Sequence, residues 1–529
     1  MTRLHRFLLS ILSGVLLSLP WLGFPGWILF VAFVPLLILD EFFVSFKKAF
    51  PIVSFWGHVF LAVLIWNILS AWWMAKVSIS GVGMAMVLNA FFMSLIWWYA
   101  HWVRRRYSSR LGYILLVVLW ISLEYLQFNW DIEWPCLQMG SVLANQIKTI
   151  QWYEFTGTFG GTLWVLLLNV LFFRIVYDVW QKNYSKRLRI NSVVFSILLL
   201  APLAISYRMF YSYVETGNPI QVAIVQPNVD PYSEQFDMDA EREKLSNFLR
   251  LAKTVTGNET DFIVGPETVF ENQWFWNEDH FKSNDFILQL DSFMNTYPKA
   301  ELLFGVSSFK VFPDKQSASK TARNKDGILY DRYNTALFLS KSGDYQVYHK
   351  SKLVMGVEKT PFLRFIPFVN DMVIDLGGAY GTLGTQAEPT NFVAKDGTPV
   401  APVICFESVF GEYLTEYVKK GAGIIFVITN DGWWKNSRGY KQHLLFSQLR
   451  AVETRRSIAR AANTGTSCFI DQRGNVLNPT PWWEEAAIKG SVNVNHKITF
   501  YVQHGDYIAR GALFVSVLLV LFLWVKRFR

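Results

Sequence analysis

The sequence predicts a protein in two parts, a bundle of about eight membrane-spanning α-helices and an α/β domain outside the membrane. The 529 residues are 52% hydrophobic but only 17% charged, against about 25% charged in soluble globular proteins. Long apolar segments fill residues 1–211 and recur at the end of the chain, whereas the stretch between them changes to short β-rich runs and helical segments. This composition excludes both an ordinary soluble enzyme and a disordered chain.

Eight segments are long and apolar enough to cross a bilayer, which requires about 20 predominantly apolar residues per helix. They lie near residues 7–22, 27–44, 53–75, 81–103, 111–128, 160–180, 193–211 and 508–525. The first segment follows Arg3 and Arg6, so it also fits a cleaved signal peptide. Six further apolar segments follow directly, which favours an uncleaved first span.

The distribution of Lys and Arg between these spans predicts the orientation of the chain. With the N-terminus in the cytoplasm, the basic clusters fall on the inner side, at 47–48, 104–110, 182–189 and 526–529. The opposite short loops carry only Lys76 and Lys148. We therefore expect a multi-pass protein of a bacterial inner membrane, with both termini cytoplasmic. The expected domains are 1–211 with seven spans, a periplasmic domain at 212–507, and the last span at 508–529.

The charges and the cysteines limit the partners that the chain can have. The net charge is +9, but residues 212–507 carry 30 Lys and Arg against 34 Asp and Glu. Because that region has no basic stripe, we expect no nucleic-acid partner. Cys136, Cys405 and Cys468 are too few for a disulfide framework and lack metal-ligand spacing. We therefore expect no metal or other cofactor, and a cysteine that works alone.

Seven short apolar runs predict the strands of the central domain. They are Ile220–Gln226, Asp261–Pro266, Ala300–Phe309, Thr335–Leu339, Val400–Phe406, Gly423–Thr429 and Ser467–Asp471. Continuous apolar strands that alternate with helical segments are typical of an α/β sheet buried on both faces.

Three strand ends carry reactive groups. Glu267 follows the apolar run at 262–264, Lys350 follows Tyr348 and His349, and Cys405 follows Val403 and Ile404. Ligands of α/β sheets bind at the carboxyl ends of strands. Each residue alone has a plain structural explanation, as a packed thiol, a surface charge or a strand-end carboxylate. Their occurrence together favours a catalytic cluster.

These residues carry a family resemblance. Pro-Glu-Thr at 266–268, Tyr-His-Lys-Ser-Lys-Leu at 348–353 and Cys-Phe-Glu at 405–407 resemble the Glu-Lys-Cys signature of the nitrilase superfamily, whose fold is an αββα sandwich. With its membrane spans, the whole chain is similar to the membrane-embedded branch of that superfamily, the apolipoprotein N-acyltransferases. Further matching stretches are 152–161, 226–228, 430–434, 442–443 and 460–465.

The resemblance implies a role for each residue of the cluster. Glu267 is implied as the general base, Lys350 as the group that stabilises the tetrahedral intermediate, and Cys405 as the nucleophile. Glu358 and Glu407 are implied as supporting carboxylates. The reaction implied is ping-pong transfer of an acyl chain from a phospholipid, through a cysteine thioester, to the α-amino group of S-diacylglyceryl-cysteine on an apolipoprotein. We expect the enzyme to act as a monomer.

The chain departs from the family pattern where lipid is expected to enter. The family element Leu-Val-Pro-Phe-Gly-Glu reads Leu-Val-Met-Gly-Val-Glu at 353–358. The residue after the nucleophile, often tyrosine in the family, is Phe406, and the family's Lys-Trp pair corresponds to Gln235-Phe236. These changes touch loops rather than the three reactive residues.

Aromatic residues predict the contacts with the acyl chain. The expected substrate-binding residues are Trp274, Trp276, Phe406 and Trp433. The loops expected to admit lipid are Glu271–Phe281 and Met355–Gly384, and Trp434, Trp482 and Trp483 are further candidates for the same entrance. For each tryptophan the alternative is a place in the domain core or an anchor at the membrane.

We also expect specific roles for four residues outside this cluster. Glu124 lies inside the fifth span, where a buried ionisable group suggests function, and the alternative is a bundle-facing residue near the outer interface. We expect His443 to support the site rather than take part in the chemistry. Cys136 and Cys468 lack flanking residues that suggest activation, so we expect them to be structural.

Two other function classes compete with acyl transfer. A membrane-anchored amidase that hydrolyses a small amide would use the same three residues with water as the acceptor. A transporter or scaffold would need no intact cluster. A simple anchor needs one span, so seven spans ahead of the domain favour the acyltransferase.

Overall fold

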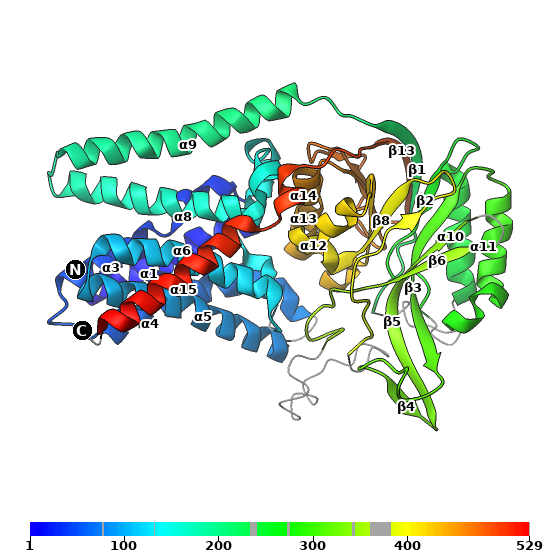
Figure 1. The fold of residues 1–529 in the computed structure, drawn as a ribbon, viewed down its shortest axis with the longest axis horizontal. Coiled ribbons are helices and arrows are strands. Elements are labelled where there is room, and N and C mark those ends of the chain that lie inside the picture. The colour runs from blue at the N-terminus through cyan, green and yellow to red at the C-terminus, as the bar shows by residue number, and fades with distance from the viewer. Residues whose placement is uncertain are drawn as a thin grey trace. The chain divides into compact units, whose positions relative to one another are not determined.

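The computed structural model describes residues 1–76, 79–131, 133–232, 241–271, 276–340, 344–359 and 382–527. The chain forms two compact units, coloured in Figure 1 by position in the sequence. One unit comprises Met1–Tyr213 and His504–Arg529, and the other comprises Val214–Gln503. Gln235-Phe236, Trp274 and most of the predicted loop Met355–Gly384 lie outside the described residues.

The first unit is helical. Its long helices are α1 (Arg3–Ser18), α3 (Val34–Ser45), α4 (Ile52–Ala71), α5 (Ile79–Arg106), α6 (Ser109–Asn129), α8 (Tyr153–Trp180), α9 (Lys186–Ser212) and α15 (Tyr507–Arg527). Within the described residues, eight helical segments are long and apolar enough to cross a membrane, from Arg3–Leu22 to Tyr507–Lys526. The prediction of about eight spans is confirmed.

Glu124 is the buried carboxylate of α6, and it has three hydrogen-bond donors. Trp120 Nε1 and the backbone N–H of Met139 donate to its Oε1 at 3.0 and 3.1 Å, and the Thr162 hydroxyl donates to Oε2 at 2.7 Å. These donors come from α6 itself, from the short helix α7 (Met139–Val142) and from α8. Glu124 therefore ties three helices together, which favours the structural reading.

The second unit is built on two β-sheets. The seven-stranded sheet has the order β13-β1-β2-β3-β5-β4, with β6 paired to β5, and the six-stranded sheet has the order β12-β11-β10-β9-β8-β7. The first contains β1 (Asn218–Gln226), β2 (Phe262–Val264), β3 (Glu301–Phe312), β4 (Arg323–Lys325), β5 (Ile328–Leu339), β6 (Tyr345–His349) and β13 (Ala486–Val494). The second contains β7 (Phe392–Val393), β8 (Pro399–Ile404), β9 (Ile424–Thr429), β10 (Ser457–Ala462), β11 (Cys468–Ile470) and β12 (Val476–Leu477).

Alternation of side chains along β1 shows how the layers are made. Val222 and Ile224 belong to the core shared with Ile404 and Ile424 of the other sheet, because successive residues of a strand point to opposite faces. Ala223 and Val225 face the other way and pack with α10 (Glu241–Val255) and α11 (Asp285–Asn295). Helices α12 (Gly411–Lys419) and α13 (Arg438–Thr454) lie beside the second sheet (Figure 1). The expected αββα sandwich is confirmed.

The parallel strands in each sheet align the ends that carry the site. β1, β2 and β3 run parallel, as do β8, β9 and β10. Parallel strands end at the same edge of a sheet, so Glu267 after β2 and Cys405 after β8 each lie at a carboxyl edge.

Candidate active site

Glu267 lies on a tight turn that follows β2. The N–H of Gly265 donates to Leu303 O at 2.7 Å, and the N–H of Gly305 donates to Pro266 O at 2.9 Å, which hold the turn against β3. A Cβ on Gly305 would lie 2.5 Å from the Thr268 nitrogen and 2.7 Å from the Glu267 Cα. Glycine at position 305 therefore lets the turn lie directly on the strand.

Lys350 follows β6 and lies between two carboxylates. Its Nζ is 3.0 Å from Glu267 Oε1 and 2.9 Å from Glu358 Oε1, and the side chain is 1% exposed. Asn334 on β5 donates from Nδ2 to the same two oxygens, at 2.7 and 2.9 Å. Backbone N–H groups of Asn430 and Val354 donate to the other oxygens of Glu267 and Glu358. Each oxygen of the two carboxylates thus accepts at least one hydrogen bond.

The charges around Lys350 keep it a cation. Burial alone would lower the pKa of Lys350, but Glu267 and Glu358 raise it well above its usual range. A buried charge is stable only when it is paired and hydrogen-bonded, and both conditions hold here. The cluster therefore keeps a positive group near the reactive thiol.

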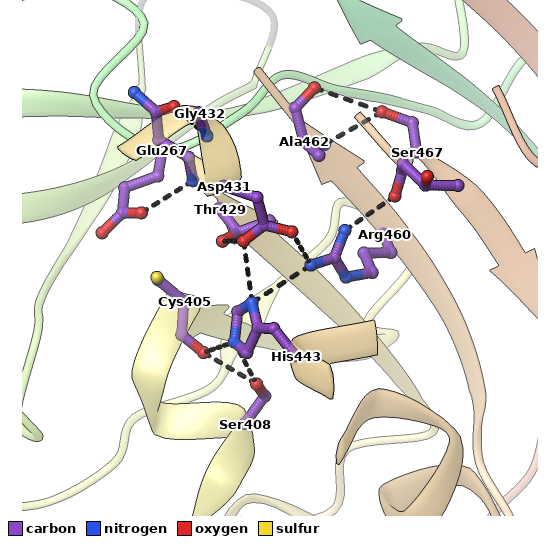
Figure 2. A network of polar contacts seen from close by, with 12 residues as sticks. Glu267, Cys405, Ser408, Thr429, Asp431, Gly432, His443, Arg460, Ala462 and Ser467 are labelled. Atoms are coloured by element: carbon purple, nitrogen blue, oxygen red, sulfur yellow. Dashed lines mark hydrogen bonds and ion pairs between the residues drawn. The ribbon is translucent and has the colours of Figure 1, made fainter. Parts of the chain in front are cut away.

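Cys405 lies at the end of β8, where the chain turns into the helical turn Cys405–Val409. Its φ angle is +49°, in the left-handed region that residues with a Cβ rarely adopt. The thiol is buried and points toward Glu267 (Figure 2). Burial, together with the charge of Glu267, raises the pKa of Cys405 well above its usual range, although Lys350 opposes this. The resting group is therefore a thiol, and it needs a base before it can attack.

Glu407 joins the loop that carries Lys350 to the strand that carries Cys405. Its Oε1 accepts hydrogen bonds from the Tyr348 hydroxyl at 2.6 Å and the Ser351 N–H at 2.7 Å, and its Oε2 accepts one from the Ile404 N–H at 2.9 Å. Burial raises the pKa of Glu407 to about 7, although these hydrogen bonds lower it. Glu407 therefore acts as a clamp between the two segments.

The cluster has the parts needed for nucleophilic acyl transfer. A base that deprotonates a cysteine and a cation near the developing oxyanion are the two aids that such a reaction requires. Within the described residues, no group of three or more His, Cys, Asp and Glu side chains is arranged to hold a metal ion. The arrangement supports covalent chemistry at Cys405.

The four predicted substrate contacts have different surroundings. Trp276 is completely buried among Phe270, Phe281, Phe286 and Phe304 on the helix-covered face of the sheet. This burial leaves no indole surface for an acyl chain, so Trp276 is a core residue. Phe406 is half-buried and contacts Phe410. Trp433 is half-buried against Tyr232, and Trp274 lies outside the described residues.

Asn334 is the contact that sequence reasoning missed. It binds both carboxylates, and its backbone carbonyl accepts the N–H of Lys350 at 2.8 Å. The available signal was a single amide at the start of the otherwise apolar run at 334–339. Such a residue is usually buried only when it is hydrogen-bonded.

Comparisons with known proteins agree with this site. The apolipoprotein N-acyltransferase N-terminal domain matches residues 13–171. An apolipoprotein N-acyltransferase of Chlorobaculum tepidum is 27% identical, covering 98% of this chain and 97% of its own. One from Geobacter metallireducens is 28% identical, covering 97% and 95%.

The family resemblance drawn from the motifs is confirmed by a match over the second unit. Residues 221–496 match the carbon-nitrogen hydrolase family, and this segment holds Glu267, Lys350 and Cys405. Since the match spans more than half of the 529 residues, the chain belongs to the carbon-nitrogen hydrolase family.

Proposed function

We propose that the protein is an N-acyltransferase that carries a fatty acyl chain from a membrane phospholipid to the N-terminal amine of S-diacylglyceryl-cysteine on apolipoproteins. The observation that carries this proposal is a buried cysteine beside a carboxylate and lysine cluster, together with the eight helices among the described residues that are able to cross a membrane. A phospholipid donor is part of the bilayer, which explains why the domain with this cluster is joined to so many candidate spans. The names of the full-length relatives support the same activity.

In the first step, Glu267 takes the proton of the Cys405 thiol and Sγ attacks the carbonyl carbon of a phospholipid ester. The negative charge on the carbonyl oxygen is stabilised by Lys350, which has three N–H donors and gives two of them to Glu267 and Glu358. The bond from the carbonyl carbon to the glycerol oxygen then breaks. That oxygen takes the proton from Glu267, and a lysophospholipid leaves.

In the second step, the α-amino group of the lipoprotein cysteine attacks the thioester. Glu267 takes a proton from the nitrogen, the carbon–sulfur bond breaks, and the Cys405 sulfur leaves as a thiolate that recovers the proton. Because Cys405 is only 7% exposed, bulk water has little access to the thioester, and the amine is the favoured acceptor.

We place the catalytic unit on the periplasmic side of a bacterial inner membrane, with both chain termini in the cytoplasm. The support is the Lys and Arg bias of the short loops and the seven candidate spans that the described residues contain between Arg3 and Ser212. We also propose that a monomer suffices, because the described cluster is drawn from one chain.

A hydrolase would use the same cluster with water in place of the amine. The match of residues 13–171 to the apolipoprotein N-acyltransferase N-terminal domain favours acyl transfer over this alternative. The two activities differ only in what discharges the thioester, so one experiment separates them.

The test is intact-mass analysis of the purified full-length protein after incubation with phospholipid. We expect a mass gain of one acyl chain that hydroxylamine removes. Cys405→Ala should show no gain, while Cys468→Ala, which removes another buried thiol of the same unit, should behave as the native protein. A folded native protein that never gains the chain would contradict phospholipid as the donor.

A synthetic peptide that begins with S-diacylglyceryl-cysteine is then added to the acylated protein. We expect the mass of the acyl chain to move from protein to peptide. Loss of the chain as a free fatty acid, with the peptide unchanged, would show a hydrolase.

A further inference from the structure

A buried row of polar side chains lies behind Cys405, on the side away from its thiol (Figure 2). His443 on α13 is its centre, with Nε2 3.1 Å from the backbone oxygen of Cys405 and Nδ1 2.8 Å from Asp431 Oδ1. His443 is 4% exposed and Asp431 is completely buried. The imidazole therefore connects the backbone of the nucleophile to a carboxylate in the core.

Asp431 is itself held firmly. Its Oδ1 accepts the Thr429 hydroxyl at 2.9 Å, and its Oδ2 forms an ion pair with Arg460 Nη2. Burial alone would raise the pKa of Asp431, but Arg460 and His443 lower it below its usual range. Arg460 Nη2 also lies 3.1 Å from His443 Nδ1, and the carboxylate is the acceptor that both groups share. Nδ1 thus faces this carboxylate and Nε2 faces the Cys405 carbonyl, so an acceptor at each ring nitrogen orients the ring.

Arg460 is anchored in turn. It lies on β10, is completely buried, and donates from Nη1 to Thr466 O at 2.7 Å. The ring of Trp434 contacts the His443 ring edge to face, with 5.3 Å between the centroids. The imidazole is therefore held by an aromatic contact as well as by its polar partners.

The Cys405 carbonyl is the atom on which this row acts. It accepts hydrogen bonds from the Ser408 hydroxyl at 2.7 Å and from His443 Nε2. Because the peptide group is planar, fixing this oxygen fixes the backbone on the carbonyl side of Cys405. Cys405 occupies the left-handed region at φ +49°, which costs free energy for a residue with a Cβ. If either donor is lost, the backbone of Cys405 can relax from this conformation, and the direction of the thiol would change with it.

We propose that His443 is a positioning residue for acyl transfer, which holds the Cys405 carbonyl so that the thiol stays aimed at Glu267, while Asp431 and Arg460 hold its ring. This inference rests on the proposed function for its rate measurement. It assigns His443 no proton transfer with the substrate.

Two conservative variants separate the contacts of the two ring nitrogens. In His443→Gln the side-chain amide nitrogen takes the position of Nε2 and can still donate to Cys405 O. In His443→Asn the amide nitrogen takes the position of Nδ1 and reaches only Asp431. A displacement of about 1 Å in a reacting group costs on the order of 100-fold in rate. We therefore expect acyl-enzyme formation to slow about 100-fold in His443→Asn and less than about 10-fold in His443→Gln.

The measured quantities are the first-order rate constant of acyl-enzyme formation at saturating phospholipid and the phospholipid concentration that gives half of this maximal rate. We expect the rate to change and the half-saturating concentration to stay constant, because His443 acts on the nucleophile alone. His496→Asn, at an exposed histidine of the same unit, is the matched control. Equal rates in the Gln and Asn variants, or a native rate in His443→Asn, would overturn the proposal.

Alkylation of Cys405 by iodoacetamide, followed by peptide mass, tests the same inference without phospholipid. If the native protein forms no acyl-enzyme, the proposed function fails, but the order of alkylation rates still decides the role of His443. We expect the native protein and His443→Gln to have similar alkylation rates, and the rate of His443→Asn to differ clearly from both. Ser408→Ala is a smaller change at the same carbonyl and serves if His443→Asn does not fold. If Ser408→Ala leaves both rates at the native value in that case, the carbonyl contact has no positioning role.

Discussion

The chemistry of a single residue, Cys405, depends on charges that oppose one another. Glu267 and burial keep its thiol protonated, whereas Lys350 favours the thiolate. In the proposed reaction the negative charge passes from Sγ to the carbonyl oxygen, and Lys350 then stabilises that oxyanion. A resting thiol is also less exposed to oxidation than a thiolate.

The first prediction concerns the base. Glu267→Gln keeps the shape of the side chain but removes the carboxylate that we propose as the acceptor of the thiol proton. We expect acyl-enzyme formation to fall by about 10² to 10⁴-fold, the usual contribution of a general base. The measurement is the time course of intact mass with phospholipid.

Glu301→Gln is the matched control for that change. Glu301 is another buried carboxylate of the same unit, and it binds the Ser340 hydroxyl and the Lys395 N–H away from the cluster. We expect its acylation rate to stay near the native value. An equal loss in both variants would mean that the base is not Glu267.

The sequence pointed to Glu267, Lys350 and Cys405 through motifs at strand ends that resemble the family signature, and the structure places Glu267 and Lys350 in contact. The hydrogen bonds of Asn334 and the contact of His443 with Cys405 could not be predicted from the sequence, for a physical reason. A hydrogen bond between residues far apart in the chain leaves no periodic pattern, and it depends on how two strands align. The pairing of Thr335 with His349 places Asn334 beside Lys350.

Among the elements of the fold, the clamp at Glu407 has a pH dependence that follows from its pKa. The folded value is about 7 against an ordinary value of 4.5, so between these pH values the folded chain holds a proton that the unfolded chain has released. The stabilisation from this group is complete below pH 4.5 and is lost as the pH rises through about 7.

We therefore expect Glu407→Gln to unfold with a flatter pH profile than the native protein. The measurement is the melting temperature in detergent at several pH values between 4.5 and about 7. Glu388→Gln, at an exposed carboxylate, should keep the native profile. Parallel native and Glu407→Gln profiles would contradict the assignment.

The contact between β3 and the Glu267 turn gives a third prediction. In Gly305→Ala the new methyl group would meet the Thr268 nitrogen and the Glu267 Cα at 2.5 and 2.7 Å, so the turn must move. We expect acyl-enzyme formation to slow by about 100-fold, the cost of a displacement near 1 Å. The control is Gly257→Ala, where the methyl group meets only the flexible carboxylate of Glu259. A native rate in Gly305→Ala would show that the turn tolerates displacement.

Strand prediction succeeded where runs are continuously apolar and failed where they are not. β9 (Ile424–Thr429) was predicted almost residue for residue. β10 reads Ser-Ile-Ala-Arg-Ala-Ala and was missed, because a charged side chain in the middle of a strand is usually exposed. Arg460 can be buried there because Asp431, from the loop after β9, pairs with its charge and Thr466 O accepts another of its hydrogen bonds. β13 reads Ala-Ala-Ile-Lys-Gly-Ser-Val-Asn-Val and was missed because Lys489, Gly490 and Ser491 interrupt its apolar residues.

For the whole molecule, the testable feature is the orientation of the chain. Exposed single cysteines report it, at Lys186, the first residue of α9, and at Lys325 on β4, in a chain that also carries Cys136→Ser, Cys405→Ala and Cys468→Ala. We expect an impermeant maleimide to label Lys325→Cys in intact spheroplasts, and Lys186→Cys only after the membrane is permeabilised. The reverse pattern would place the catalytic unit in the cytoplasm.

The edge of the larger sheet has a consequence for synthesis of the protein. β1 pairs along its whole length with β13, so that Asn218 lies beside Val494. A ribosome finishes β1 long before it makes its partner, and pairings between such distant segments form slowly. Until then β1 has an unpaired edge that can recruit other chains. The nascent domain therefore stays incomplete until β13 is made, and a chain that stops short of Ala486 would be a substrate for chaperones and proteases rather than a smaller enzyme.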